Sequence, residues 1–574
     1  MMQRNWGIVA ILLAAGLALL AAGCASEPRQ AADLVLFNGK VVTVDEAGTE
    51  AQAVAVKDGK ILAVGSDDEI RPHIQEGTEA IDLEGRLAIP GFIEGHGHFM
   101  GIGNAKLILD LTKPKNWDEI VALVAEAVQS AQPGEWIRGR GWHQDKWDKP
   151  TDPSWEGFPI HDSLSAVSPD NPVALTHASG HASFVNAKAL EVSGVDGKTP
   201  NPLGGEILLD KRGRPTGLLR ERAQGLVRGG NQLSAEEREA QARKVAQLAA
   251  QDCLSKGITS FQDAGAGFQT IDLFKELADE GALPLRLWVM IRASNQQLAE
   301  KLAQYRSIGY GGDHLTVRAI KVSIDGALGS RGAWLLEPYS DAPELSGLNL
   351  VPVEDVQETA RLAAEHDYQL CVHAIGDRAN RQVLDIFEET FKANAKANAE
   401  KSDWRWRIEH AQHLHPDDIP RFGQLGVIAS MQGVHCTSDA PWVPDRLGDQ
   451  RSEEGAYVWQ KLIKTGALVS NGTDAPVEDV SPIASYYSTV SRRLKDGSIF
   501  YPDQRLSRME ALRSYTINVA IAAFEEDIKG SLEPGKLADI TVLSKDILTI
   551  PEEEIPSTEV VYTIVGGKVA YKAE

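Results

Sequence analysis

The chain has 574 residues, 43% of them hydrophobic, so it can bury the cores of two or three structural units and is not a disordered protein. Its formal net charge is −23 at pH 7 and no cluster of lysine and arginine stands out, which argues against a nucleic-acid partner. We therefore expect a globular protein whose acidic surface mainly serves solubility.

The first residues form a predicted targeting segment. A weakly positive start is followed by an apolar stretch over residues 7–22, and small residues precede Cys24. The segment 1–24 resembles a bacterial lipoprotein signal, although Ala21 stands where that pattern prefers leucine. An uncleaved membrane anchor is the alternative. In the lipoprotein interpretation Cys24 is lipidated, and the lipid anchors the protein to a membrane of the cell envelope.

Residues 25–32 are a polar tether between the anchor and the folded part of the chain. Three further cysteines follow at wide spacing, at positions 253, 371 and 436. Because their number is odd and their surroundings are apolar, we expect buried thiols and no disulfide framework.

Short strands are expected at both ends of the folded part. Residues 33–88 alternate strand-like runs with the turn pairs Asn38-Gly39 and Asp58-Gly59. A similar pattern returns only in residues 529–574. We interpret the two segments as one small β-sandwich module assembled from both chain ends.

Between these segments, over residues 89–528, strand-like runs alternate with helical patterns. The apolar run Leu87–Pro90 opens the first predicted strand, which we interpret as a buried parallel strand. The predicted strands end near His98, Asp263, Arg292, Asp325, His373, His410, His435 and Asp474. Eight such units predict an α/β fold with a (β/α)₈ TIM-type barrel, and a doubly wound sheet is the alternative.

A segment of about residues 136–230 interrupts this alternation. It is rich in glycine, proline and tryptophan and follows the first strand and its helix, so we interpret it as an inserted cap on a barrel loop. Trp142, Trp147 and Trp155 are candidates for the lining of an apolar pocket, with structural packing as the alternative use.

The candidate chemistry lies at the predicted strand ends. Alternate residues of an extended strand point to one face, so His96 and His98 can direct two imidazoles at one ion, whereas a solvated loop is the simpler interpretation. A lone buried histidine usually packs in a core. In a barrel, however, the carboxyl ends of the strands converge, and five strands carry candidate ligands there. The set is His96, His98, Lys321, His373, His410 and Asp474.

The motifs in this order resemble the amidohydrolase superfamily, and within it the YtcJ-like (amidohydrolase 3) branch that includes N-substituted formamide deformylases. The resemblance extends from about residue 34 to residue 574. The matching sequence motifs are Pro90-Gly-Phe-Ile-Glu-Gly-His-Gly-His98, Ser179-Gly-His-Ala182, Lys321-Val-Ser-Ile-Asp-Gly-Ala-Leu-Gly-Ser-Arg331, His373-Ala-Ile-Gly-Asp-Arg-Ala379, Arg407-Ile-Glu-His-Ala411, Ser430-Met-Gln432, Gly472-Thr-Asp-Ala-Pro476 and Pro534-Gly-Lys-Leu-Ala-Asp539.

This resemblance implies a centre of two divalent metal ions, usually zinc. One ion would be held by His96, His98 and Asp474, the other by His373 and His410, and Lys321 would bridge both as a carbamate. A lysine ammonium has no lone pair to donate, so Lys321 is a ligand only when modified or deprotonated; the alternative is a salt bridge to Asp325. Two such ions polarise an acyl oxygen and turn a shared water into hydroxide, with Asp474 as the base.

A second group of candidates surrounds these ligands. His181 is predicted to hydrogen-bond substrate or the developing oxyanion, and Arg331 to clamp a carboxylate or carbonyl of the substrate. The alternative for each is a hydrogen bond that only orders a loop. The residues predicted to orient the ligands from behind are Asp377, Glu409, Gln432 and His435.

We therefore predict a lipid-anchored, metal-dependent hydrolase that cleaves a carbon–nitrogen bond, other than a peptide bond, in a small molecule. Ester or lactone hydrolysis, or isomerisation, on the same scaffold is one alternative. A non-catalytic envelope protein with a binding or regulatory role is the other. The ligand types accept zinc, manganese, iron or cobalt. No motif specifies the substrate or an oligomeric state, and a homodimer stays open.

Overall fold

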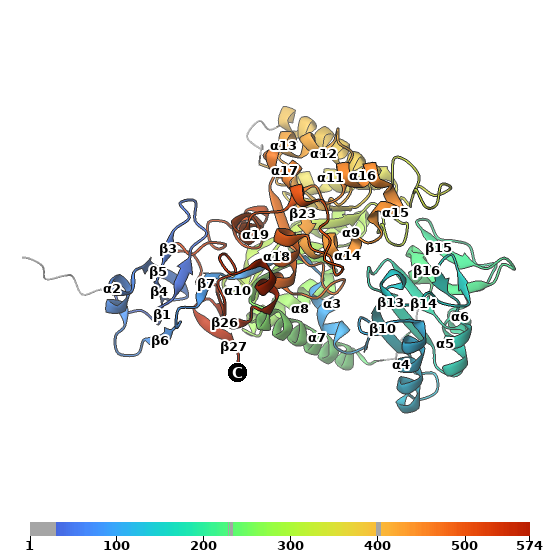
Figure 1. Ribbon diagram of the computed structural model, residues 1–574, viewed down its shortest axis with the longest axis horizontal. Coiled ribbons are helices and arrows are strands. Elements are labelled where there is room, and N and C mark those ends of the chain that lie inside the picture. Colours follow the sequence, from blue (N-terminus) through green and yellow to red (C-terminus); the bar gives the residue numbers. More distant parts are fainter. Residues whose placement is uncertain (1–29, 228, 230–232, 398–402) are drawn as a thin grey trace, which may run out of the picture.

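The computed structural model describes residues 30–227, 229, 233–397 and 403–574, which form three units side by side (Figure 1). A central barrel lies between a β-sandwich that contains both ends of the described chain and an inserted unit. The predicted signal segment with Cys24 and most of the tether fall outside the described residues. Within the described part, no helix has the length and apolar character needed to cross a membrane.

Eight parallel strands, paired in chain order, form the central barrel. The last strand meets the first where the backbone N–H of Asp474 donates to the carbonyl of His96 at 2.7 Å. The strands are β8 (Phe92–Gly97), β17 (Ile258–Ala266), β18 (Arg286–Ile291), β20 (Leu315–Ser323), β21 (Gln369–Ala374), β22 (Arg407–His410), β23 (Ile428–Gln432) and β24 (Val469–Gly472). The predicted (β/α)₈ barrel fold is confirmed.

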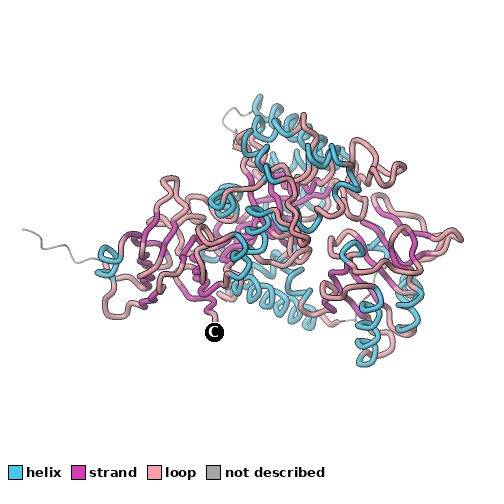
Figure 2. Tube along the Cα trace, in the orientation of Figure 1, coloured by secondary structure: helices cyan, strands magenta, loops and turns pink. Residues whose placement is uncertain are grey.

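Helices surround the barrel strands (Figure 2) and cover the outward-facing apolar side chains. Polar caps define where several of them begin. The side chain of Ser234 accepts a hydrogen bond from the backbone of Glu237, and Glu237 accepts one from the backbone of Ser234, which forms a capping box. The helices around the barrel are α3 (Phe99–Ala105), α7 (Ala235–Ser255), α8 (Phe268–Asp279), α9 (Asn295–Tyr305), α10 (Tyr310–Asp313), α11 (Val353–Glu365), α12 (Asp377–Ala397), α13 (Ile419–Leu425), α14 (Gly433–Asp439), α15 (Val443–Leu447), α16 (Asp449–Gly455), α17 (Trp459–Lys464), α18 (Pro482–Ser491), α19 (Arg508–Ser514) and α20 (Ile517–Ala522).

Two expected strand positions differ from the structure. The run Leu87–Pro90 is β7, which belongs to the sandwich, and the barrel strand β8 starts only after Gly91. A Cβ atom at Gly91 would lie 2.2 Å from Oγ1 of Thr259, so the chain passes from one unit to the other where only glycine fits. The seventh strand ends at Gln432, and His435 lies in helix α14.

The sandwich packs a sheet of N-terminal strands against a sheet shared by both chain ends. The first sheet runs β5 (Lys60–Gly65), β4 (Ala53–Lys57), β1 (Leu34–Phe37), β6 (Glu79–Asp82), with α2 (Asp67–Ile70) beside it. The second runs β27 (Lys568–Lys572), β26 (Val560–Val565), β25 (Ile540–Leu543), β7, β2 (Lys40–Val42), β3 (Glu50–Ala51). Apolar side chains from both sheets form one buried core. An ion pair between Arg286 of β18 and Asp539 joins the barrel to the sandwich. Both side chains are buried, and the nitrogen–oxygen distances are 2.7 Å (Nε to Oδ2) and 3.0 Å (Nη2 to Oδ1).

The inserted unit has its own six-stranded sheet and its own core. The sheet runs β15 (Gly205–Leu209), β16 (Pro215–Glu221), β14 (Ala182–Val185), β13 (Val173–His177), β10 (Ile137–Trp142), β9 (Leu109–Asp110). Its helices are α4 (Trp117–Ser130), α5 (Asp162–Val167) and α6 (Ala187–Ser193), and the short strands β11 (Ser154–Trp155) and β12 (Phe158–Pro159) pair separately. Because β9 pairs with β10 and α4 packs on this core, the unit starts earlier in the chain than residue 136.

The three tryptophans of this unit serve its packing. Trp142 is fully buried in the core, and Trp147 and Trp155 pack against that core from its edge. None of the three is among the residues that line the cavity described below.

Candidate metal centre and its cavity

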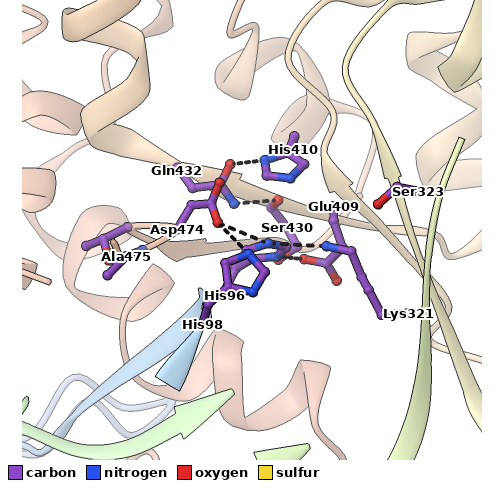
Figure 3. A network of polar contacts seen from close by, with 12 residues as sticks. His96, His98, Lys321, Ser323, Glu409, His410, Ser430, Gln432, Asp474 and Ala475 are labelled. Carbon is purple, nitrogen blue, oxygen red and sulfur yellow. Dashed lines mark hydrogen bonds and ion pairs between the residues drawn. The ribbon is translucent and has the colours of Figure 1, made fainter. Parts of the chain in front are cut away.

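The candidate ligands come from separate strands and meet at the carboxyl end of the barrel (Figure 3). His96 lies near the end of β8, His410 ends β22, and Asp474 follows β24. One ligand atom of each lies within 4.8 Å of the others, and all three residues are buried.

The other three candidates lie around this group. The Nε2 atom of His98 is 3.2 Å from Oδ1 of Asp474, and the Nζ atom of Lys321 is 3.3 Å from Nε2 of His96. His373 is the next-to-last residue of β21, and its ring centroid is 4.4 Å from that of His410. The structure therefore brings all six predicted ligands together.

Burial keeps the histidine ligands in the neutral form that binds a cation. It lowers the pKa of His96 to about 4, aided by the nearby charge of Lys321, and it holds the pKa values of His373 and His410 well below the ordinary histidine value. Burial also lowers the pKa of Lys321 to about 8. For Asp474 burial acts in the opposite direction, but the hydrogen bond from His98 and the charge of His96 keep its pKa well below the ordinary value. Neutral imidazoles beside an ionised carboxylate suit a divalent metal ion.

Two of the predicted orienting residues hold histidine rings from behind. Nδ1 of His96 hydrogen-bonds to Glu409, whose carboxylate is in turn paired with Arg407 at 2.7 Å. Nδ1 of His410 lies 2.7 Å from the side-chain oxygen of Gln432. Both rings therefore direct Nε2 toward the centre of the site, because Nδ1 is already engaged.

The other predicted residues of this kind lie elsewhere. Asp377 accepts hydrogen bonds from the backbones of Leu336 and Arg378 and does not line the main cavity. His435 contacts Gln412 at 3.1 Å and faces a second, smaller hollow behind His410. The position beside His373 belongs instead to Asp325, whose Oδ1 is 3.5 Å from Nε2 of that histidine. In the part of the chain that the structure describes, Asp325 forms no ion pair with Lys321.

His181 and Arg331, the two predicted substrate-contacting residues besides Asp474, have different positions. His181 lines the cavity, and its ring centroid is 5.2 Å from that of His373. Arg331 does not line it, because its guanidinium pairs with Asp341 at 2.9 Å. The structure thus leaves Arg331 outside the site.

Sequence reasoning missed one residue of the site, Glu221. Its Oε2 atom is 2.8 Å from Nδ1 of His181, and this carboxylate raises the pKa of His181 although burial alone would lower it. Glu221 adopts a positive φ of 50° at the end of β16. No recognisable motif surrounds it, so only the pairing of β14 with β16 in the folded protein reveals its partner.

A cavity of about 900 Å³ lies between the barrel and the inserted unit and opens onto the ligand group. The barrel contributes five of the six candidate ligands to its wall, and the inserted unit contributes His181 and Glu221. A cavity of this size accommodates a small organic molecule.

The residues present fit a divalent metal ion. Nε2 of His373 is buried without a hydrogen-bond partner, although buried polar atoms are normally paired. A bound cation would satisfy this nitrogen. Imidazole nitrogens and a carboxylate are also the donor types that such ions accept in proteins.

Comparison with known proteins gives a consistent family assignment. The model of the Amidohydrolase family matches residues 79–571. The chain is 35% identical to "Protein LONG AFTER FAR-RED 3" of Arabidopsis thaliana, over 94% of this chain and 92% of that protein. It is 31% identical to "Putative amidohydrolase YtcJ" of Bacillus subtilis, over 94% and 99% of the two chains. It is 28% identical to "N-substituted formamide deformylase" of Arthrobacter pascens, over 95% and 99%.

Among solved structures, an uncharacterized metal-dependent hydrolase from Pyrococcus horikoshii matches with a TM-score of 0.71 and 26% identity. The match covers 91% of this chain and 99% of that one. Sequence and fold therefore agree over nearly the whole described chain.

Proposed function

We propose, on the premise that this chain belongs to the amidohydrolase family, that it hydrolyses a carbon–nitrogen bond of amide type in a small molecule. The convergence of six candidate ligands from five strands at one cavity carries the proposal. Similarity to a metal-dependent hydrolase structure supports the general class of reaction. Similarity to a formamide deformylase favours an amide-type bond over an ester.

We assign the binding of one divalent ion, zinc being the first candidate, to His96, His98 and Asp474, and that of a second ion to His373 and His410. When bound, such ions polarise a carbonyl oxygen and lower the pKa of water. Lys321 would bridge the two as a carbamate. Its lowered pKa of about 8 supports this modification, because only the neutral amine can form a bond to carbon dioxide, with release of a proton.

The protein's own groups would move the protons of the reaction. Asp474 is buried beside the other candidate ligands and has a lowered pKa, so it can accept the proton of the attacking water and deliver it to the leaving nitrogen. His181 has a raised pKa beside Glu221, so it can donate a hydrogen bond to the oxygen on which negative charge develops.

The location of the protein is a separate proposal that rests on residues 1–24 alone. We propose that Cys24 carries a lipid that anchors the protein to the cell envelope. The test is metabolic labelling with an alkyne fatty acid. The full-length chain is expected to take up label and partition into membranes, and the Cys24→Ala variant is expected to lose both properties.

The first experiment on the proposed activity measures metal content by elemental mass spectrometry on the soluble form that starts after Cys24. Lys321→Ala is compared with Lys568→Ala, which changes an exposed lysine of the sandwich. We expect about two ions per chain in the wild type and in Lys568→Ala, with a clear loss in Lys321→Ala. Turnover of N-substituted formamides, N-acyl amines, esters and lactones then identifies the bond cleaved.

No metal in any form, even after reconstitution with zinc or manganese and bicarbonate, would overturn the metal-dependent mechanism. The non-catalytic binding or regulatory role would then be the better explanation.

A further inference from the structure

Three arginines line the cavity together with the candidate ligands: Arg140, Arg222 and Arg292. Arg140 lies in β10 and Arg222 directly follows β16, so both belong to the inserted unit. Arg292 directly follows β18, so it belongs to the barrel. Positive charge therefore faces the cavity from both sides, in a chain whose formal net charge is −23.

None of these three guanidinium groups has a carboxylate partner among the described residues. Arg140 donates to the backbone carbonyls of Ala178 and Pro476 at 3.1 and 3.3 Å. Arg292 donates to the hydroxyl of Ser323 at 2.8 Å. These acceptors are neutral and leave several donors of each group free, because a guanidinium carries five.

The acidic side chains that line the same cavity either contact other groups or form no ion pair with these arginines. Asp474 belongs to the candidate ligand set, and Glu221 hydrogen-bonds to His181. Asp355 also lines the cavity but forms no ion pair with any of the three arginines in the described structure. Among the described residues, no carboxylate therefore forms an ion pair with any of the three arginines.

Charge interactions join Arg292 to Arg222, and join both Arg292 and Arg140 to the ligand group. Burial lowers the pKa of Arg292, and the positive charge of Arg222 lowers it further. The charge of Asp474 reaches both Arg292 and Arg140. The stem of Arg292 packs at Gly265, where an added Cβ would lie 3.1 Å from Cδ. Clustered like charges that face water-filled space are best stabilised by a bound counter-ion.

We propose that this arginine wall, formed by Arg140, Arg222 and Arg292, binds a carboxylate on the part of the substrate that does not react. The substrate is then an anionic amide whose carboxylate is held between the inserted unit and the barrel while the amide carbonyl meets the candidate metal centre. A guanidinium fork binds the two oxygens of a carboxylate in a fixed orientation, which would also set the position of the scissile bond. The inference rests on the proposed hydrolase function and adds the charge class of the substrate.

Direct binding tests the arginine wall without any turnover. The probes are 3-phenylpropionate and the neutral 3-phenylpropanol, which contain no carbon–nitrogen bond, titrated calorimetrically into the metal-loaded soluble protein. We expect the carboxylate to bind about tenfold more tightly or better, and to lose this advantage at high salt. Arg222→Gln and Arg292→Gln are each expected to remove most of the preference. The control Arg212→Gln, at an exposed position in the turn between β15 and β16, is expected to keep it.

The phosphonate analogue with the same two-carbon spacer, 2-phenylethylphosphonate, distinguishes the two oxyanion types. Tighter binding of the phosphonate than of the carboxylate by tenfold or more would assign the wall to phosphoryl groups and overturn the carboxylate assignment. Equal binding of the carboxylate and the alcohol, unchanged in the arginine variants, would overturn the inference altogether.

Turnover separates this inference from the proposed function. N-Benzylformamide and 4-(formamidomethyl)benzoate share the same scissile bond and differ by one carboxylate. Faster kcat/KM for the benzoate, with a ratio that falls in Arg292→Gln, supports both proposals. Hydrolysis of both at equal kcat/KM refutes only the arginine wall. Hydrolysis of neither, with the binding preference intact, refutes only the assigned reaction.

Discussion

The buried ion pair between Arg286 and Asp539 allows a quantitative test of how the barrel and the sandwich are held together. Both side chains are buried, and two hydrogen bonds join them. Asp539 also accepts from the backbone of Gly566 at 2.8 Å. Asn at position 539 retains an acceptor for Gly566 but removes the negative charge, so Arg286 is left as an uncompensated buried cation. We expect Asp539→Asn to lower the free energy of unfolding by about 3–5 kcal/mol.

The pH dependence of this contribution has a defined sign. Burial would raise the pKa of Asp539, but the charge and hydrogen bonds of Arg286 outweigh it and hold the pKa below the ordinary value. A lowered pKa in the folded state means that the contribution is complete above the pKa of the unfolded state, about 3.9, and is lost as the pH falls through the folded-state value. The difference between wild type and Asp539→Asn should therefore be constant above about pH 5 and shrink on acidification.

The assay is urea unfolding followed by both tryptophan fluorescence and circular dichroism, with coincident transitions required for a two-state treatment. Asp33→Asn is the matched control, because it removes an exposed ion pair with Lys57 in the same sandwich and is expected to leave the midpoint nearly unchanged. The double variant Arg286→Met/Asp539→Asn should be less destabilised than the sum of the two single variants. A loss below about 1 kcal/mol for Asp539→Asn, or additive single variants, would refute the reasoning.

Two of the three further predictions concern the site, and one concerns the packing of helix α3. Glu409→Gln should weaken metal binding by about 10–100-fold, because the ring of His96 loses its orienting carboxylate; competition with a fluorescent chelator measures this. Gly103→Ala should cost about 1–3 kcal/mol of stability in urea unfolding, because the added Cβ would lie 1.9 Å from the carbonyl oxygen of Val245. His181→Asn should lower kcat by about 10²-fold while metal content is unchanged, since this side chain acts on substrate and not on a metal ion.

Matched controls sharpen these predictions. Glu337→Gln, Gly267→Ala and His366→Asn change the same residue types away from the site, and an added Cβ at Gly267 meets no atom within 4 Å. Wild-type metal affinity in Glu409→Gln would contradict the orienting role. Wild-type stability in Gly103→Ala would contradict the tight helix contact. Loss of metal in His181→Asn would assign that residue to the metal centre instead.

The barrel and its ligand group were predictable from the sequence because each signal is local. A buried parallel strand is an apolar run, and a catalytic residue at its end directly follows that run, so His373 and His410 could be assigned before any coordinates. The division at Gly91 was not predictable in the same way. The runs on its two sides are separated by one residue and both are buried, and only pairing partners far along the chain decide that Leu87–Pro90 joins the sandwich.

The parts that sequence reasoning missed depend on contacts between distant segments. Glu221 has no motif of its own, and its role follows only from the pairing of β14 with β16, which places it beside His181. Arg331 belongs to a matching motif, but Asp341 pairs with it outside the cavity. Asp377 likewise follows a candidate ligand in sequence, yet it caps backbone amides, and Asp325 takes the place beside His373. Proximity in sequence to a ligand is therefore a weak guide to proximity in space.

The sheet that joins both chain ends has a consequence for biosynthesis. Strand β7 ends at Pro90, and its partner β25 begins at Ile540, so about 450 residues separate them. At ordinary rates of translation this interval takes about 20–90 s. Throughout that time the apolar side chains of the N-terminal sandwich strands lack the C-terminal strands that bury them. Strand β7, which leads into the first barrel strand, also lacks its partner β25. The nascent chain must therefore be kept from aggregating until β25 emerges, and the shared sheet of the sandwich forms only then.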